Sequence, residues 1–412
     1  MPPMAPPTLA LLSLWAVLAA CSAQDDPIGA LTPSDLEAAR QTPQGVFNVS
    51  AVTWNPYRDA VMDVNVTGPV ASGDWIRVSF SGIPFPDPHG KDWVALYVPG
   101  DADPAEVSPV KYRNAKHAEG YMDTGAGSLD FILENHRDTM RFYFMRKAPG
   151  EPFVAAKSPL IQLANPNAPM QVHLALTANH SEMKIQWVTK DTGSPAVEWG
   201  TSPGHYTSRS KATSTTYTRD DMCGPPANTT GFIDPGVFHA ATVTGVKPLE
   251  QIYYRVGDEV SGYGPEHSFI APPLPAASSS VIFAVLGDMG QSEVDKSNEP
   301  YQLDASLETS SRLEADDDLQ LVLHIGDLGY ACGYVAQWDR FYAQLQPIIS
   351  RVPYMTCPGN HERDYPNSGD RWGSSHSSGG ECGVAYARRQ QMPRPGDDKM
   401  WYSFDFGPIH FS

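Results

Sequence analysis

The chain has 412 residues, too many for one ordinary hydrophobic core, and its 41% hydrophobic content excludes a largely disordered protein. Only 18% of the residues are charged, while Pro (38) and Gly (34) are abundant, a balance that favours turn-rich β structure over long surface helices. Acidic residues outnumber basic ones by 47 to 29 and no cluster of Lys and Arg occurs, so binding to nucleic acid through phosphate neutralisation is not expected.

The first 23 residues are predicted to be a secretory signal peptide. An apolar run from Thr8 to Ala20 is too short to span a bilayer, and small residues follow it up to Ala23. Residues 18–21 also resemble a bacterial lipoprotein cleavage box, which would leave a lipid on Cys21. No later segment reaches the roughly 18 apolar residues of a transmembrane helix. We therefore expect a secreted, extracellular protein without a transmembrane segment.

Two further patterns favour export. N-glycosylation acceptor tripeptides begin at four asparagines: Asn48, Asn65, Asn179 and Asn228. Removal of the signal peptide leaves four cysteines, an even number that is compatible with disulfide bonds; they are Cys223, Cys332, Cys357 and Cys382. Their spacing does not fix a pairing, and the last three, which cluster together, could equally be buried thiols.

Residues 45–164 are predicted to form a β-sandwich. Three segments alternate between apolar and polar residues and are bounded by Pro, Gly and Asp, at 75–80, 92–98 and 140–145. Such period-two segments are typical of strands with one buried and one solvated face. The segment shows no convergent set of titratable residues, so we expect a structural or binding domain.

Residues 168–273 are predicted to form a second sandwich, after a linker at residues 165–169. Alternating segments at 171–177 and 183–189 begin a series of about seven short strands, which is typical of immunoglobulin-like and fibronectin III-like domains. Residues 246–256 resemble the fibronectin III tyrosine corner, but Ile252 occupies the place of the corner tyrosine. The hydrogen bond of that corner is therefore in doubt.

The pattern changes in residues 279–412. Short apolar runs at 281–286, 319–325 and 354–357 predict strands that are buried on both faces. Residues 301–317 have a helical composition, and residues 335–349 space their apolar side chains three and four apart, as an amphipathic helix does. Strands that alternate with helices indicate βαβ units and a parallel sheet.

Polar residues follow each of these three strands, after a glycine. The first strand leads to Asp288, the second to Asp327 and Tyr330, and the third to Asn360 and His361. Ligands bind beyond the carboxyl ends of neighbouring parallel strands, so we expect these side chains to converge. Carboxylate, amide and phenolate oxygens suit hard cations, and two such cations form the clamp that hydrolyses phosphate esters.

The three motifs, Gly-Asp-Met-Gly, Gly-Asp-Leu-Gly-Tyr and Gly-Asn-His-Glu, resemble the first three of five metal-binding blocks in purple acid phosphatases, within the calcineurin-like metallophosphoesterases. Residues 217–224, 338–341, 379–383 and 401–403 agree with that family, from about residue 168 onward. The additional N-terminal β-domain is similar to that of the long, plant-type members. The resemblance implies two N-terminal β-sandwich domains, the second fibronectin III-like, followed by a partial α/β metallophosphoesterase domain.

The resemblance also implies a role for each residue of the motifs. Asp288 would bind Fe³⁺, and Asp327 would bridge Fe³⁺ and a divalent metal, Zn²⁺, Mn²⁺ or Fe²⁺. Tyr330 would bind iron as a phenolate, the source of the purple colour, and Asn360 would bind the divalent metal. His361 would contact the substrate phosphate and assist the leaving group as an acid.

Two further blocks, Val-x-x-His and Gly-His-x-His, supply the remaining histidine ligands in the family, and neither occurs before the sequence ends at Ser412. We therefore expect little or no phosphatase activity from these 412 residues alone. For the intact protein we expect hydrolysis of small phosphomonoesters at acid pH. The alternatives are phosphodiesterase or nucleotidase chemistry, and a non-enzymatic secreted glycoprotein whose β-domains bind a partner. Family members often form homodimers.

Overall fold

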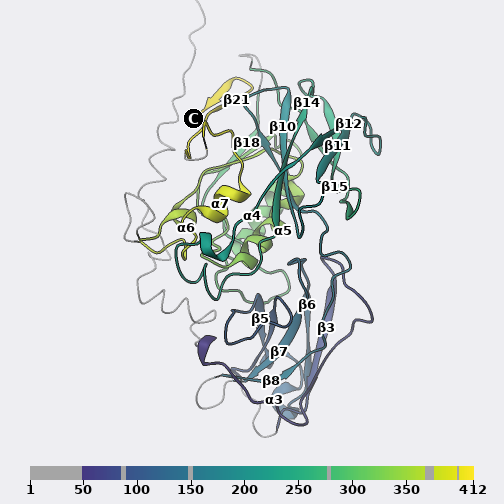
Figure 1. Cartoon of the computed structure of the whole chain (residues 1–412), viewed down its shortest axis with the longest axis vertical. Helices are drawn as coiled ribbons and strands as arrows, with labels where there is room; N and C mark the ends of the chain where they lie inside the picture. Colours follow the sequence, from purple (N-terminus) through teal and green to yellow (C-terminus); the bar gives the residue numbers. More distant parts are fainter. Residues whose placement is uncertain (1–48, 85–89, 147–151, 276–279, 367–374, 397–398) are drawn as a thin grey trace, which may run out of the picture. The chain divides into compact units, whose positions relative to one another are not determined.

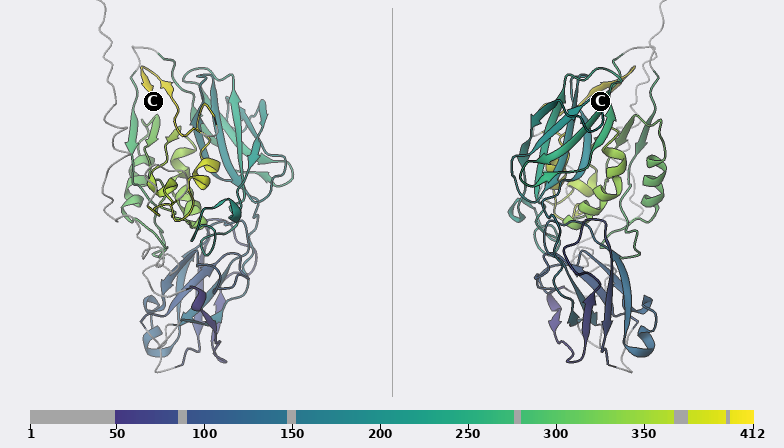
Figure 2. Two further views of the ribbon diagram at one scale, coloured as in Figure 1. Left: turned by 60° about the vertical axis from the view of Figure 1, so that its left-hand side comes forward. Right: turned by 90° about the vertical axis from the view of Figure 1, so that its right-hand side faces the viewer.

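The computed structural model describes residues 49–84, 90–146, 152–275, 280–366, 375–396 and 399–412. The predicted signal peptide, Cys21 and the glycosylation acceptor Asn48 lie outside these ranges. Within them, two β-rich regions precede an α/β region along the chain (Figures 1 and 2), which confirms the predicted multidomain β plus α/β fold class. No helix in the described ranges is long and apolar enough to cross a membrane.

The N-terminal region forms two sheets, with the strand orders β1-β8-β7-β4-β5 and β2-β3-β6. All neighbours are antiparallel except the parallel pair β1 and β8. Its strands are β1 (Thr53–Trp54), β2 (Val61–Val64), β3 (Trp75–Ser81), β4 (Trp93–Tyr97), β5 (Lys111–Asn114), β6 (Gly127–Ile132), β7 (Arg141–Arg146) and β8 (Phe153–Lys157). Short helical turns lie at Val49–Ala51 (η2), Ala115–His117 (η3) and Tyr121–Thr124 (α3).

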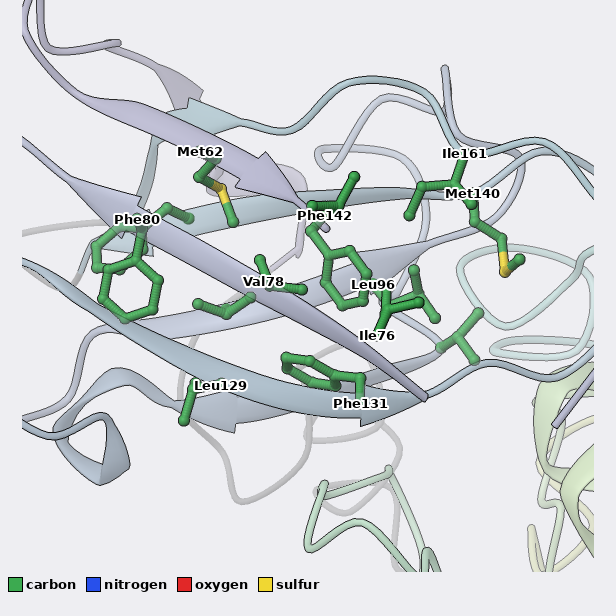
Figure 3. Packing of buried hydrophobic residues seen from close by; sticks show 14 of the residues in the cluster. Met62, Ile76, Val78, Phe80, Leu96, Leu129, Phe131, Met140, Phe142 and Ile161 are labelled. Carbon is green, nitrogen blue, oxygen red and sulfur yellow. The ribbon is translucent and has the colours of Figure 1, made fainter. Parts of the chain in front are cut away.

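Strand β3 shows why this part of the sequence forms a sandwich. Its even-numbered side chains, Ile76, Val78 and Phe80, are buried, while the residues between them are exposed. Figure 3 shows these side chains packed in one cluster with Phe131 of β6 and Phe142 of β7, whose rings lie 4.7 Å apart. The cluster joins the two sheets, so the alternating pattern places one face of each sheet in a shared core.

The second region pairs a four-stranded sheet, β13-β14-β10-β9, with the sheet β12-β11-β15-β16, to which β17 is added next to β15. Strand β14 was not predicted, although it pairs with both β10 and β13. The strands are β9 (Met170–Leu176), β10 (Glu182–Thr189), β11 (Ala196–Gly200), β12 (Ser208–Lys211), β13 (Thr213–Thr215), β14 (Val237–Thr244), β15 (Gln251–Asp258), β16 (Gly262–Tyr263) and β17 (His267–Ile270), with a turn η4 at Arg219–Asp221.

Ile252 is buried in the core of this second sandwich. The buried tyrosine of the same strand is Tyr254, and its hydroxyl donates a hydrogen bond of 2.6 Å to the backbone oxygen of Ser350. Tyr254 of β15 therefore contacts the residue after helix α5 (Val335–Ile349) in the α/β region.

The α/β region has a three-stranded parallel sheet in the order β18-β19-β20, as predicted. A short antiparallel hairpin, β21 and β22, follows it along the chain. The elements are β18 (Phe283–Leu286), α4 (Ala305–Glu314), β19 (Leu321–His324), α5 (Val335–Ile349), β20 (Tyr354–Thr356), α6 (Asn360–Arg363), α7 (Val384–Arg389), β21 (Phe404–Phe406) and β22 (Ile409–Phe411).

Helix α5 begins and ends at the predicted residues, and its apolar stripe is buried: Trp338, Phe341, Tyr342 and Leu345. The opposite, polar face is buried as well. Asp339 accepts hydrogen bonds from the two terminal nitrogens of the Arg137 guanidinium (3.0 and 2.7 Å) and from Gln171 Nε2 (2.6 Å), and it lies 3.0 Å from His136 Nδ1. Although burial alone would raise the pKa of Asp339, the Arg137 guanidinium and the contact with His136 hold it well below its usual range.

Candidate metal centre

The loops that follow β18 and β19 run side by side past the ends of their strands. The backbone N–H of Asp288 donates to the oxygen of Gly326 (3.2 Å), and that of Gly290 donates to the oxygen of Leu328 (2.8 Å). The hydrogen bonding of the parallel pair therefore continues into the loops. This arrangement puts the two predicted carboxylates, Asp288 and Asp327, at the same edge of the sheet, where ligands of α/β proteins bind.

Two glycines allow the loops after β19 and β20 to touch. A Cβ atom on Gly359 would lie 2.1 Å from Asp327 Oδ1, and one on Gly326, whose φ is +112°, would lie 3.0 Å from Gly359 Cα. No side chain larger than hydrogen fits at Gly359 unless the Asp327 carboxylate moves and so does its backbone nitrogen, which would lie 2.5 Å from the added Cβ. The Gly-Asp and Gly-Asn motifs thus have a steric basis.

Tyr330 and Asp288 form a pair of candidate ligands. The Tyr330 hydroxyl donates to Asp288 Oδ1 at 2.9 Å. Their φ angles are +49° and +53°, a region that non-glycine residues rarely adopt, so surrounding contacts hold them there. Two oxygens bound to one ion at about 2.0–2.2 Å and roughly at right angles lie about 3 Å apart. The pair therefore fits a shared cation.

Glu362, to which the sequence analysis assigned no role, fastens the loops together. Its carboxylate accepts hydrogen bonds from the backbone N–H groups of Asp327 (3.0 Å), Leu328 (2.8 Å) and Gly359 (2.8 Å). Burial, and then the charge of Asp327, raises the pKa of Glu362 to about 8. The bond from the Gly359 N–H to Glu362 is one half of a capping box, but Gly359 has no side chain to form the other half, so the sequence lacks that signature.

His361, the predicted catalytic residue, is buried beside the candidate ligands. Its backbone N–H donates to Asp327 Oδ1 at 3.0 Å, and its ring centroid lies 4.3 Å from that of Tyr330. The ring Nδ1 lies 3.1 Å from the backbone oxygen of Ser377, which can only accept, and 3.4 Å from the sulfur of Cys332. A proton on Nδ1 would be donated to the Ser377 oxygen. Nε2 is then the nitrogen that can exchange a proton with a substrate.

Asn360, the fourth predicted ligand, is the first residue of α6, next to His361. Among the residues that the structure describes, no three His, Cys, Asp or Glu side chains form a group that could hold a metal ion. The candidate set instead combines two carboxylates with a phenol and an amide: Asp288, Asp327, Tyr330 and Asn360. These ligand types match hard cations, and they leave room for further ligands.

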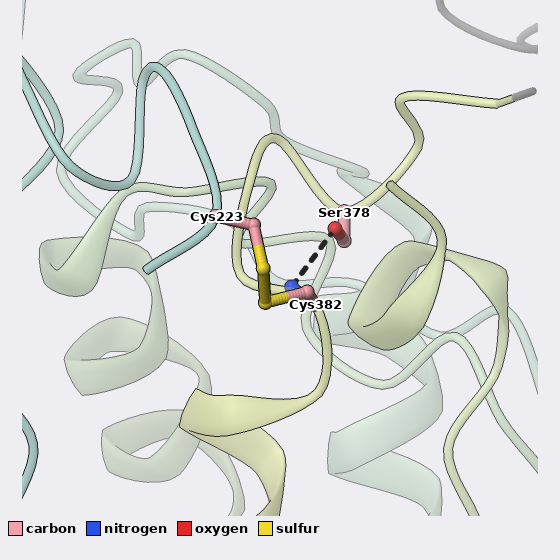
Figure 4. Close-up of a disulfide and its surroundings, with 3 residues drawn as sticks. All are labelled: Cys223, Ser378 and Cys382. Carbon is pink, nitrogen blue, oxygen red and sulfur yellow. Dashed lines mark hydrogen bonds between the residues drawn. A yellow bond between two sulfur atoms is a disulfide. The ribbon is translucent and has the colours of Figure 1, made fainter. Parts of the chain in front are cut away.

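A disulfide joins Cys223, which precedes β14, to Cys382, which precedes α7 (Figure 4). The Cys382 N–H also donates to Ser378 Oγ at 3.2 Å. The other two disulfide candidates, Cys332 and Cys357, carry thiols in the structure, which is the alternative that the sequence left open for them. The reason is local for Cys332, since its buried sulfur lies 3.4 Å from His361 Nδ1, beside the candidate site.

Three family models match the chain in order. Residues 62–165 match the Fn3-like domain from purple acid phosphatase, residues 169–271 match the purple acid phosphatase N-terminal domain, and residues 282–402 match the calcineurin-like phosphoesterase domain. The chain belongs to the purple acid phosphatase family.

Several plant members of the purple acid phosphatase family are similar to this chain. Probable inactive purple acid phosphatase 27 of Arabidopsis thaliana is 37% identical over 362 residues, which are 82% of this chain and 58% of that protein. A nucleotide pyrophosphatase/phosphodiesterase of Hordeum vulgare is 45% identical over 148 residues, 35% of this chain and 40% of that protein. The chain thus spans less than two thirds of the length of these relatives.

A solved structure has the same fold. Purple acid phosphatase PPD1, isolated from yellow lupin (Lupinus luteus) seeds, superposes with a TM-score of 0.79 at 34% sequence identity, covering 86% of this chain and 66% of that one. The family generally uses a binuclear metal centre. Asp288 and Tyr330 fit such a centre, because their oxygens already lie at the separation of two ligands on one ion.

Proposed function

We propose that the protein to which these residues belong hydrolyses small phosphomonoesters at acid pH, using a binuclear centre of Fe³⁺ and Zn²⁺, Mn²⁺ or Fe²⁺. The observation that carries the proposal is the 2.9 Å contact between Tyr330 Oη and Asp288 Oδ1 at the carboxyl edge of the parallel sheet. A phenol beside a carboxylate is a hard-oxygen pair suited to a ferric ion.

Each residue of the site has a proposed task. Asp288 and Tyr330 would hold the ferric ion, Asp327 would bridge the two metals and Asn360 would bind the divalent one. Such a metal pair, when bound, supplies an acidified water and a clamp on the phosphoryl oxygens. His361 would hydrogen-bond the phosphate and give a proton from Nε2 to the leaving oxygen, while Nδ1 would donate to the backbone oxygen of Ser377.

Replacement of Tyr330 by Phe tests this proposal in a protein that carries the complete domain. We expect the wild type to bind two metal ions and to absorb visible light through its iron phenolate. Tyr330→Phe should lose that absorption while the circular dichroism spectrum stays unchanged. Metal analysis and visible spectra would check this, and a wild type that binds iron without colour would contradict the Tyr330 assignment.

A second candidate is hydrolysis of phosphodiesters or nucleotide pyrophosphates, which the 45% identity to the barley pyrophosphatase/phosphodiesterase favours. Rates on a phosphomonoester, a phosphodiester and a dinucleotide pyrophosphate, measured with one metal-loaded preparation, separate the two. A preference of tenfold or more for either substrate class, on the order of 1.4 kcal/mol of transition-state discrimination, decides between them.

A third candidate is a non-enzymatic glycoprotein that binds a partner through its β-domains, which the words "probable inactive" in the names of the Arabidopsis relatives favour. Full metal loading without turnover of any of the three substrates would support it. We also propose that the protein is secreted and N-glycosylated, since Asn65 and Asn179 are exposed, and that it forms a homodimer. Glycosidase-sensitive mass and light scattering test these proposals.

A further inference from the structure

Six ionisable side chains outside the candidate metal-binding set are buried together. They come from β5, the loop after β6, the segment 292–299 and helix α5, and none of the six residues is more than 8% exposed. We call them the Lys111 cluster; its members are Lys111, Glu134, Glu293, Asp295, Glu299 and Arg340. Four carboxylates thus face two cations, so a fully ionised cluster would hold two uncompensated negative charges away from water.

The two cations, Lys111 and Arg340, form ion pairs with three of the four carboxylates. Lys111 Nζ donates to Glu293 Oε2 and to Asp295 Oδ2, both at 2.9 Å. Arg340 forms an ion pair with Glu134 and also donates from Nε to the backbone oxygen of Ser292 at 2.9 Å. Burial alone would lower the pKa of Lys111, but the carboxylates raise it, so Lys111 stays charged.

Glu299 is the remaining carboxyl group, and it is 4% exposed. Among the residues that the structure describes, no N–H or O–H donor reaches either of its oxygens. The carboxyl group that interacts most strongly with it is that of Glu293, which is buried as well. Two carboxylates that contact each other with no donor between them repel strongly, whereas one proton between them converts the contact into a hydrogen bond.

We propose that Glu293 and Glu299 share one proton, and that loss of this proton as the pH rises loosens segment 292–299 from the N-terminal sandwich. Burial, followed by the Glu293 carboxyl, raises the pKa of Glu299 well above its ordinary value, and burial likewise raises that of Glu293. The groups that face Glu299 from the other elements are Glu134 and Arg340, while Asp295 and Lys111 face Glu293. Asp295 stays ionised, because Lys111 and further donors outweigh its burial and lower its pKa.

The sign of the effect follows from proton linkage. An unfolded glutamate has a pKa of about 4.3, so above this pH the closed segment binds one more proton than the open segment. Opening therefore becomes easier as the pH rises, by up to about tenfold per pH unit until the pKa of the closed pair is reached. At acid pH the segment stays closed.

Two backbone hydrogen bonds report on this closure. The Tyr112 N–H donates to Asn298 O (3.0 Å), and the Asn298 N–H donates to Tyr112 O (2.7 Å), so β5 and the segment hold each other. The Ile132 N–H also donates to Asp295 Oδ2 at 2.9 Å. These three amides lose their acceptors when segment 292–299 opens, and their hydrogen exchange measures the opening directly.

The experiment is hydrogen exchange of the whole chain at pH 5 and at pH 8, with rates divided by the intrinsic rate at each pH. We expect the protection of the Tyr112, Ile132 and Asn298 amides to fall at least tenfold between pH 5 and pH 8, while amides in β10 keep theirs. Equal protection at the two pH values would overturn the proposal, and this measurement needs no variant.

Glu299→Gln supplies a second, independent test. The amide can donate permanently to Glu293 and cannot lose a proton, so protection at pH 8 should return to the pH 5 value of the wild type. The matched control is Glu308→Gln on α4, whose side chain is 70% exposed and which should keep the wild-type pH dependence. A Glu299→Gln protein that still loses protection at pH 8 would show that another group causes the loss.

Discussion

At the scale of single residues, the candidate metal centre depends on glycines as much as on its polar side chains. Asp327 can sit against the loop after β20 only because Gly359 has no side chain. The backbone of that loop then donates from His361 to the same carboxylate. A substitution at Gly359 should therefore disturb both the position of the Asp327 carboxylate and its hydrogen bond from the His361 N–H.

Gly359→Ala is expected to weaken metal binding at least tenfold and to lower stability by about 1–3 kcal/mol, because its methyl group would overlap Asp327 Oδ1. Metal titration and thermal unfolding of the metal-free protein measure the two effects. Gly68→Ala is the matched control, since nothing lies within 4 Å of its Cβ position. Unchanged metal affinity in Gly359→Ala would mean that Asp327 is not a ligand.

The sequence placed Asp288, Asp327 and Asn360 at strand ends, and the parallel order of β18, β19 and β20 supports that placement, although their metal-binding roles remain predictions. It did not reveal the contacts of Glu362 or the thiol of Cys332 beside His361. Those contacts depend on how loops from three strands meet, which no local pattern specifies. The disulfide partner of Cys223, 159 residues away, was hidden for the same reason.

At the scale of elements, buried strands and helices with a clear period were predictable. Helix α5 was found at its predicted residues because its apolar side chains follow the helical period. Strand β14 was missed because His239, Ala240 and Ala241 weaken its alternation, although all three are buried. The burial of the polar face of α5 was not predictable either, because its partner Arg137 lies in a different domain.

The disulfide is the covalent connection between the second sandwich and the loop before α7. Cys223→Ser/Cys382→Ser should lower the free energy of unfolding by up to roughly 4–5 kcal/mol, because the bond closes a very long loop in the unfolded chain. Urea denaturation measures this loss. The control Cys357→Ser removes a half-buried thiol outside the disulfide and should cost far less. Equal midpoints for the double variant and the wild type would contradict the pairing.

At the scale of the whole molecule, buried neutral histidines should set the acid limit of stability. Burial lowers the pKa values of His173 and His239 to about 4 each. Both ring nitrogens of His239 lie beside hydroxyl groups, of Thr189 (2.7 Å) and Ser214 (2.9 Å), which satisfy a neutral ring. These histidines contribute their full stability above the unfolded pKa of about 6.5 and lose it as the pH falls toward 4.

His239→Gln tests this limit. Its free energy of unfolding should fall less steeply between pH 6.5 and pH 4 than that of the wild type, by about 1.4 kcal/mol per pH unit, the value of one proton. Denaturation at several pH values measures the slope, and the exposed His205→Gln is the control. The dependence of stability on pH caused by His239 is opposite in sign to that of the Glu293–Glu299 pair. If the slope of the unfolding free energy against pH is the same in His239→Gln and the wild type, other groups set the acid limit.

The carboxylate of Asp339 also has a consequence for biosynthesis. Among the residues that the structure describes, its hydrogen-bond partners are His136, Arg137 and Gln171, which precede it in the chain by at least 168 residues. When α5 emerges from the ribosome, both sandwiches have already been synthesised and can already present their donors, as domains that fold from the N-terminus do. The donors to Asp339 are therefore present before α5 folds, and its carboxylate need not be buried without partners. In a circularly permuted chain that makes α5 first, these donors would be synthesised only after the helix.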